Sequence, residues 1–156
     1  MSTLSSKATA IWSAHGVAAV LEWPEQVKKA LHNLQGTTVT QDAGTHNWIH
    51  LPVPAAGWLA KRVEHVIGFG FRAACNENAR IDLVRLRDSG MAFTNGGTPS
   101  YQDQVSFLGE AVFYEKELPE KLNWYSGRVI SVHVQFLSGS PTGRIEFRGG
   151  EIFTKN

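Results

Sequence analysis

Apolar and polar residues alternate in twos over most of this chain, and this period restricts the fold more than any other feature. Side chains of a β-strand point alternately to the two faces of its sheet, so each alternating run predicts a strand with one apolar face. Such runs include RVEHVIGFGFR and VISVHVQFL, and turn segments such as RDSG and LSGSPTG separate them. The residues that the alternation predicts for the core are Ile67, Phe69, Phe71, Ile130, Val132, Val134 and Phe136.

One segment has a helical period instead. Pro24 suits the first position of a helix, and Glu25 suits the positive end of its dipole. Apolar residues then recur at three- and four-residue steps up to Leu34. We expect a short helix over residues 24–35. No second helical pattern of this quality follows, which disfavours a parallel sheet built from βαβ units.

Short strands and glycine-rich turns predict an all-β fold. We expect an antiparallel β-sandwich that is jelly-roll-like and carries one short helix, with an open barrel as the alternative. A length of 156 residues fits one domain with a proper hydrophobic core. We therefore expect a single β-sandwich domain over residues 1–156, in which residues 1–7 form a flexible N-terminal tail.

The charge balance restricts the partners. Lys and Arg number 15 and Asp and Glu number 14, so the net charge of +1 gives no electrostatic attraction for a phosphate backbone or an anionic membrane. The longest apolar run, VAAVL, is too short to cross a bilayer. We expect neither nucleic acid nor a membrane as a partner. The expected location is the cytoplasm, with export by a route without a cleaved signal as the alternative.

Several short motifs stand in an order that resembles a known family. His15-Gly16 is followed by Trp23-Pro24-Glu25, and Asn47-Trp48 precedes an apolar strand with prolines. Together with the segments around them, they are similar to a family of small bacterial proteins catalogued only as a domain of unknown function. The resemblance covers most of the chain and is weakest over residues 94–125. It implies a compact β domain that often stands alone, and it supplies no catalytic residue.

A glycine motif matches a dinucleotide fingerprint in letters but not in context. Residues 68–73, GFGFRA, have the form G-x-G-x-x-A. The fingerprint needs a helix N-terminus to receive the pyrophosphate, whereas a turn and another strand follow here. We expect two glycines in a closely packed strand and no nucleotide cofactor.

Histidines offer a second possible site. His46 and His50 are four residues apart, and His133 or Asp42 would be the further ligands of a metal ion. A zinc or iron site needs three or four convergent ligands, and six scattered histidines supply such pairs by chance. We expect hydrogen-bonded surface or interface histidines and no metal.

The chain lacks the commonest catalytic signatures. The sequence contains no G-x-S-x-G, P-loop or H-E-x-x-H motif. Cys75 is the single cysteine, so it cannot form an intramolecular disulfide, and its surroundings match no nucleophile signature. We expect Cys75 to be a small packed hydrophobe and assign no catalytic residue.

The stretch HNWIHLPVP is the most distinctive strand. Ile49, Leu51 and Val53 would face the core. The opposite face carries Trp48, His50, Pro52 and Pro54. Because the two prolines remove backbone donors from one side of the strand, we expect an edge strand or one whose final part leaves the ladder.

The Trp48 ring has three interpretations. In the first, the ring is a stacking platform for a sugar or another flat ligand. In the second, the 24–35 helix or the KLNWYSG loop covers the ring. In the third, the ring is a subunit contact. For the first interpretation, we expect the ring at the rim of a cleft beside residues 119–125. The candidate ligand-binding residues are Trp48, His50, Asn47, Arg72, Trp124 and Tyr125.

We therefore predict a non-catalytic module that binds a carbohydrate or another small, partly apolar molecule without a cofactor. One alternative is a cofactor-independent isomerase or cyclase with a β cavity, in which His50 or His133 supplies acid–base help. Another is a self-assembling interaction protein that forms a homo-oligomer through its edge strand.

Overall fold

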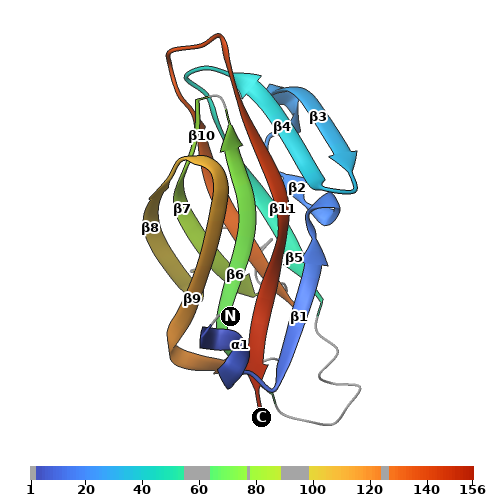
Figure 1. Ribbon diagram of the computed structural model, residues 1–156, viewed down its shortest axis with the longest axis vertical. Helices are drawn as coiled ribbons and strands as arrows, with labels where there is room; N and C mark the ends of the chain where they lie inside the picture. Colours follow the sequence, from blue (N-terminus) through green and yellow to red (C-terminus); the bar gives the residue numbers. More distant parts are fainter. Residues whose placement is uncertain (1–2, 55–63, 77, 89–98, 124–126) are drawn as a thin grey trace.

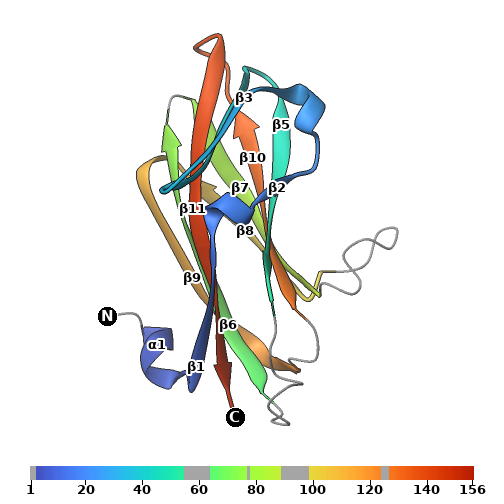
Figure 2. The same cartoon turned by 90° about the vertical axis from the view of Figure 1, so that its right-hand side faces the viewer.

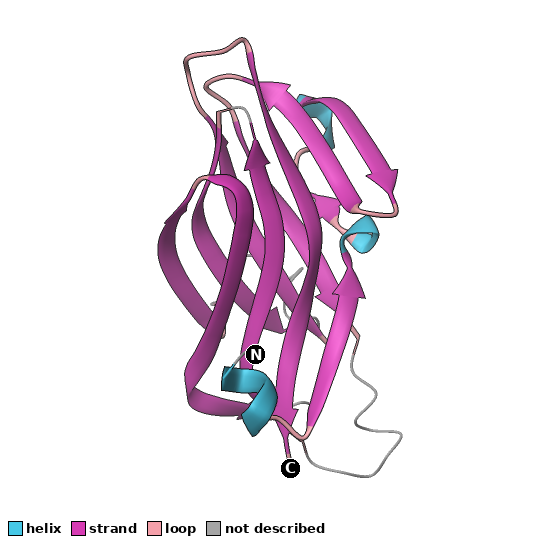
Figure 3. Cartoon of the chain, in the orientation of Figure 1, coloured by secondary structure: helices cyan, strands magenta, loops and turns pink. Residues whose placement is uncertain are grey.

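The fold is known from a computed structural model, which describes residues 3–54, 64–76, 78–88, 99–123 and 127–156. Within these residues, eleven strands form two antiparallel sheets that pack face to face (Figure 1, Figure 2). Strands dominate the chain, as Figure 3 shows. The predicted antiparallel β-sandwich is therefore confirmed.

We call the six-stranded sheet sheet A and the five-stranded sheet sheet B. Sheet A has the order β3 (Val27–Asn33), β4 (Gly36–Asp42), β11 (Thr142–Lys155), β6 (His65–Asn76) and β9 (Gly109–Asn123), and β1 (Ala10–His15) also pairs with β11. Sheet B has the order β2 (Val20–Leu21), β5 (His46–Val53), β10 (Arg128–Phe136), β7 (Ala79–Asp88) and β8 (Tyr101–Phe107). Two single 3₁₀ turns, η1 (Gly16–Ala18) and η2 (Pro24–Gln26), flank β2.

The predicted core residues are all buried, and all but one lie between the two sheets. The exception is Ile67, which packs in a second cluster with Leu4 and Phe153. The pairing of β6 with β9 shifts register between Val66 and Gly68, so the alternation changes face there. As a result Val66 enters the main core, and Ile67 turns to the outer face of sheet A.

The helix expected over residues 24–35 is wrong. After η2, the chain continues as β3, which pairs with β4 in a hairpin. Leu31 is 46% exposed and Leu34 is 97% exposed, so the apolar stripe that indicated a helix covers no core. Strand pairing with the threonine-rich β4 satisfies the backbone of this segment and overrides its helical preference.

The α-helix lies instead in the segment expected to be a flexible tail. Residues Thr3–Lys7 form α1, which lies on the outer face of sheet A (Figure 1). Leu4 is 2% exposed because it packs against Ile67 and Phe153, so the tail expectation is corrected for these residues. No helix within the described residues is long and apolar enough to cross a membrane.

Candidate functional site

The outer face of sheet B carries Trp48 and His50, which belong to the HNWIHLPVP strand that the sequence singled out. In β5, Asn47, Ile49, Leu51 and Val53 are buried, whereas Trp48 and His50 are partly exposed on the opposite face. The predicted division of the strand into two faces is therefore confirmed.

Within the described residues, no strand pairs with one side of β5 near its end, as the prolines indicated. The Glu22 N–H donates to the Trp48 carbonyl oxygen at 3.0 Å, so even-numbered residues of β5 direct their backbone groups to the β2 side. The pairing of β2 with β5 covers Ile49 and His50. Pro52 lies beyond that pairing, so its missing N–H removes no ladder bond between the strands that the structure describes.

Other side chains of sheet B surround the Trp48 ring. The Arg85 guanidinium lies over the ring, 4.6 Å from its centroid. The His133 ring centroid is 5.0 Å from that of Trp48, and the His50 ring lies nearly parallel at 6.3 Å. A ligand that stacks on the covered side of Trp48 must displace Arg85, which weakens the platform interpretation.

His133 joins His46 rather than His50. Its Nδ1 lies 2.6 Å from Asp82 Oδ1, and its Nε2 lies 3.1 Å from His46 Nδ1. Within the described part of the chain, no group of three His, Cys, Asp or Glu side chains has an arrangement that could hold a metal ion. The proposed His46–His50 ligand pair is not brought together with Asp42, which forms an ion pair with Lys28 on sheet A.

His50 has its own partners on the same face. Its Nδ1 lies 2.8 Å from Ser131 Oγ, and its Nε2 lies 3.2 Å from Glu22 Oε2. Burial lowers the pKa of His50, while the hydrogen bond and charge of Glu22 partly oppose that shift. Both ring nitrogens thus have partners inside the protein.

Asn47 and Arg72, which were also predicted for the Trp48 site, do not lie on its face. Asn47 is fully buried, where its side chain accepts from the Trp23 N–H and donates to the Trp23 carbonyl and to Gln41. Arg72 lies on β6, in the other sheet. Trp124 and Tyr125 lie outside the described residues.

Two further expectations about this site can be compared with the described residues, although residues 124–125 of the expected cleft lie outside them. Residues 119–123 belong to β9 in sheet A, so the chain there is in the other sheet from Trp48. Residues 24–35 form no helix, so the expected helical cover of Trp48 is wrong.

The His15-Gly16 motif has a structural role. A side chain at Gly16 would place its Cβ 2.0 Å from the Phe147 carbonyl oxygen, so only glycine permits this approach of η1 to β11. The Gly16 carbonyl accepts a hydrogen bond from the Thr37 hydroxyl at 2.8 Å. The motif therefore fastens η1 to sheet A.

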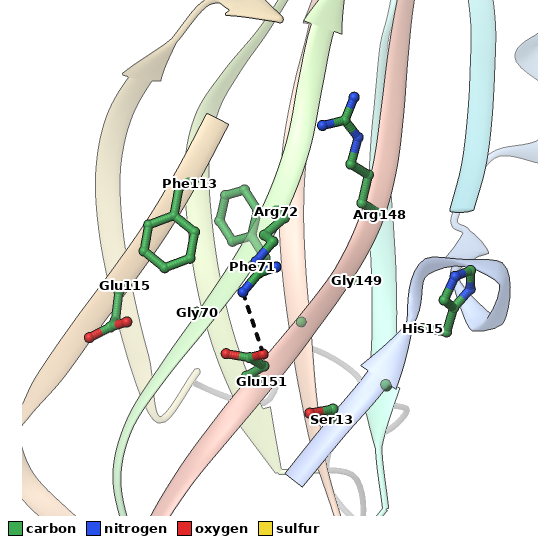
Figure 4. Close-up of a pocket in the computed structure, with 12 residues that line it drawn as sticks. Ser13, His15, Gly70, Phe71, Arg72, Phe113, Glu115, Arg148, Gly149 and Glu151 are labelled. Carbon is green, nitrogen blue, oxygen red and sulfur yellow. Dashed lines mark ion pairs between the residues drawn. The ribbon is translucent and has the colours of Figure 1, made fainter. Parts of the chain in front are cut away.

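The outer face of sheet A is hollowed instead of flat. A depression of about 430 Å³, which we call the groove, lies over β6 and β11. Gly70 and Gly149 form part of its floor, Phe113 stands on the β9 side, and Ser13 and His15 stand on the β1 side (Figure 4). The groove thus combines an aromatic side chain with polar ones in a concave surface.

Strand geometry explains why the floor is bare. A Cβ at Gly70 would lie 2.6 Å from the Tyr114 carbonyl oxygen, because the backbone of β9 passes close to β6. The register of β11 shifts between Phe147 and Gly149, where its neighbour changes from β4 to β1. Such a bulge disturbs the regular projection of side chains from the face.

Phe113 is the residue that the sequence analysis missed. Its side chain is 55% exposed, and the Arg72 guanidinium lies 5.6 Å from its ring centroid. Arg72 also approaches Glu151, with 3.9 Å between Nη2 and Oε1 (Figure 4). The signal was present in QVSFLGEAVFY, because the buried Val112 and Tyr114 leave Phe113 on the outward face.

Cys75 is a buried free thiol in the core. The side chain is buried, and its burial raises the pKa of the thiol to about 11, although a backbone hydrogen bond with Ile81 acts in the opposite direction. The thiol therefore stays protonated near neutral pH. This agrees with the interpretation of Cys75 as a small packed side chain.

No family model matches the chain, and no curated protein matches it, in agreement with the resemblance to a family without an established activity. The chain is similar in structure to a family two carbohydrate esterase from Cellvibrio japonicus, with a TM-score of 0.51 and 7% identity over 94% of this chain and 34% of that chain. It thus spans about a third of that protein.

Two other solved structures are similar over their whole length. The xylan-binding module CBM86 from Roseburia intestinalis has a TM-score of 0.48 and 11% identity, over 94% of this chain and 96% of that one. The K1 cleaved adhesin domain of Lys-gingipain from Porphyromonas gingivalis W83 has a TM-score of 0.47 and 8% identity, over 94% and 99%. At such low identity, the similarities concern the fold and assign no ligand.

Proposed function

We propose that this chain is a non-catalytic carbohydrate-binding module whose ligand lies in the groove on the outer face of sheet A. The observation that carries the proposal is the exposed Phe113 ring beside Arg72 and Glu151, at the edge of a hollow whose floor includes Gly70 and Gly149. Exposed aromatic rings that border a concave surface mark binding sites more often than scattered apolar residues do.

The chemistry of the groove suits a polyhydroxylated ligand. The C–H face of a sugar ring packs against an aromatic ring, while each sugar hydroxyl both donates and accepts hydrogen bonds. Arg72 and Arg148 supply donors, and Glu115 and Glu151 supply acceptors. The two guanidinium groups balance the two carboxylates, so the groove favours a neutral ligand over an anionic one.

The positions of His50 and His133 support a binding module over an enzyme that uses either of them. An isomerase or cyclase that uses His50 or His133 needs its substrate at the outer face of sheet B, whereas the groove lies on sheet A. On sheet B, both histidines are engaged with Asp82, Ser131 and neighbouring side chains.

The Trp48 face is the second candidate site for the same class of ligand. The ring is partly exposed, and Arg85 and His50 beside it offer polar contacts. A third role of this face is a contact between two copies of the chain, in which case Trp48→Ala gives a smaller species in size-exclusion chromatography.

A glycan array followed by titration calorimetry with the best glycan tests the proposal. Phe113→Ala should weaken binding about tenfold or more, because the ring contributes both stacking and buried area. Leu108→Ala is the matched control, since Leu108 is 60% exposed and lies outside the groove lining. Loss of binding in Trp48→Ala with no change in Phe113→Ala would move the site to sheet B.

A further inference from the structure

A second hollow continues the groove along the same sheet. It has a volume of about 500 Å³, and Ala74, Asn76 and Glu110 are among its lining residues. Arg148 lines both hollows. Along β6, Gly70 and Arg72 line the first hollow and Ala74 and Asn76 line the second, so one face of one strand runs under both.

The two hollows together extend along β6. The stretch of β6 from Gly70 to Asn76 spans about 20 Å at the usual rise of a strand. On the side toward residue 67, α1 covers the sheet, and the Leu4 N–H donates to Glu115 Oε1 at 3.2 Å. A bound molecule therefore extends from the first hollow toward Asn76.

We propose that the two hollows form one binding site for a linear, neutral glycan that lies along β6, with Phe113 in the first hollow and Glu110 in the second. This inference rests on the proposed function of the groove. A chain of sugar rings matches an elongated surface, and Arg148 contacts the unit that lies between the hollows.

The polar groups of the second hollow support a neutral chain. Glu110 and Arg144 add one carboxylate and one guanidinium, so the balance of charge that holds in the first hollow continues. Arg148 is held by Glu146, with 2.6 Å between Nε and Oε1, which orients its guanidinium at the junction. Mixed donors and acceptors along the whole site fit repeated hydroxyl groups.

The length dependence of affinity tests the inference. Titration calorimetry would use two series of β-1,4-linked oligosaccharides, xylose-based and glucose-based, from the disaccharide to the hexasaccharide. We expect affinity to rise by about tenfold or more between the disaccharide and the longer members and then to level off, because added units fill the second hollow. If the disaccharide binds as tightly as the hexasaccharide, the inference is overturned while the proposed function stands.

Two variants assign the hollows to parts of the ligand. Phe113→Ala should weaken every member of the series, whereas Glu110→Ala should weaken only the longer members, by about fivefold to tenfold for a lost hydrogen bond. Glu120→Ala is the control, because Glu120 is also exposed on β9 but lines neither hollow. Equal effects of Glu110→Ala on short and long members would overturn the two-hollow site.

The failure of the proposed function has a different signature. If no member of either series and no glycan on the array binds the folded protein, both the proposed carbohydrate binding and the proposed site along β6 are wrong. If oligosaccharides bind and their affinity depends on Trp48 but not on Phe113 or Glu110, carbohydrate binding survives and the site along β6 does not.

Discussion

The two outer faces of the sandwich use similar side chains to opposite effect. On sheet B, Trp48 stands among Arg85, His50 and His133, and these groups contact one another across the sheet. On sheet A, Phe113 stands beside a floor of glycines, so its ring borders a hollow. The comparison indicates that glycines, as well as aromatic side chains, shape a concave surface on a sheet.

The energetic consequence differs between the faces. A ligand on sheet B must separate Arg85 from Trp48 or compete with the partners of His50, and each broken contact subtracts from its affinity. On sheet A, Arg72 likewise lies near the Phe113 ring and Glu151, but the hollow of about 430 Å³ beside these side chains is already open. This difference is the reason for placing the ligand there.

The largest effect on stability is expected for a substitution in the core that lies beneath both faces. Phe69→Ala should reduce the free energy of unfolding by about 3–5 kcal/mol, because the ring is fully buried between the sheets and its loss leaves a cavity. Urea denaturation monitored by tryptophan fluorescence measures it. A loss below about 1 kcal/mol would show that the ring is not part of the common core.

Substitution of Trp48 and of Phe113 should change stability less, and by different amounts. Trp48→Ala should reduce the free energy of unfolding by about 1–2 kcal/mol, because the ring is partly buried and stacks with Arg85. Phe113→Ala should change it by less than about 0.5 kcal/mol, as expected for an exposed side chain. Chemical denaturation of both variants measures the difference, and the reverse order would contradict the assignment of roles to the two faces.

The smallest expected effect is the pH dependence that His50 on sheet B contributes. Because burial lowers the pKa of His50 in the folded state, the unfolded state takes up the proton first as the pH falls below the ordinary value of 6.5. The contribution of His50 to stability is therefore present above pH 6.5 and is lost below it, toward the folded-state pKa.

His50→Gln, which keeps a polar side chain, should flatten that part of the stability profile and leave glycan affinity unchanged. Urea midpoints of the wild type and the variant on both sides of pH 6.5 measure the effect. An unchanged slope in His50→Gln would show that His50 does not carry the dependence.

The alternation of apolar and polar residues was enough to predict the fold class and the core, because it directly reflects which face of each strand is buried. It failed at Val27–Asn33, where a run of Lys, Ala and Leu reads as a helix until β4 supplies a strand to pair with. Local preference is weak beside such long-range pairing.

The candidate site was harder to predict than the fold. Trp48 and His50 lie in one continuous segment, so the sequence revealed their shared face. The segment did not predict that Arg85 of β7 lies over the Trp48 ring. The groove joins Ser13, Gly70, Phe113 and Gly149 from four strands, and their register sets its shape. No local pattern contains that information, although the outward position of Phe113 was readable.

The most direct test of the central claim is an amide and indole chemical-shift titration of the wild-type protein with the best-binding glycan. We predict that the largest changes fall on Gly70, Arg72, Phe113 and Gly149, while the indole N–H of Trp48 stays in place. Changes concentrated on Trp48, His50 and His133, with the groove residues unmoved, would contradict the account.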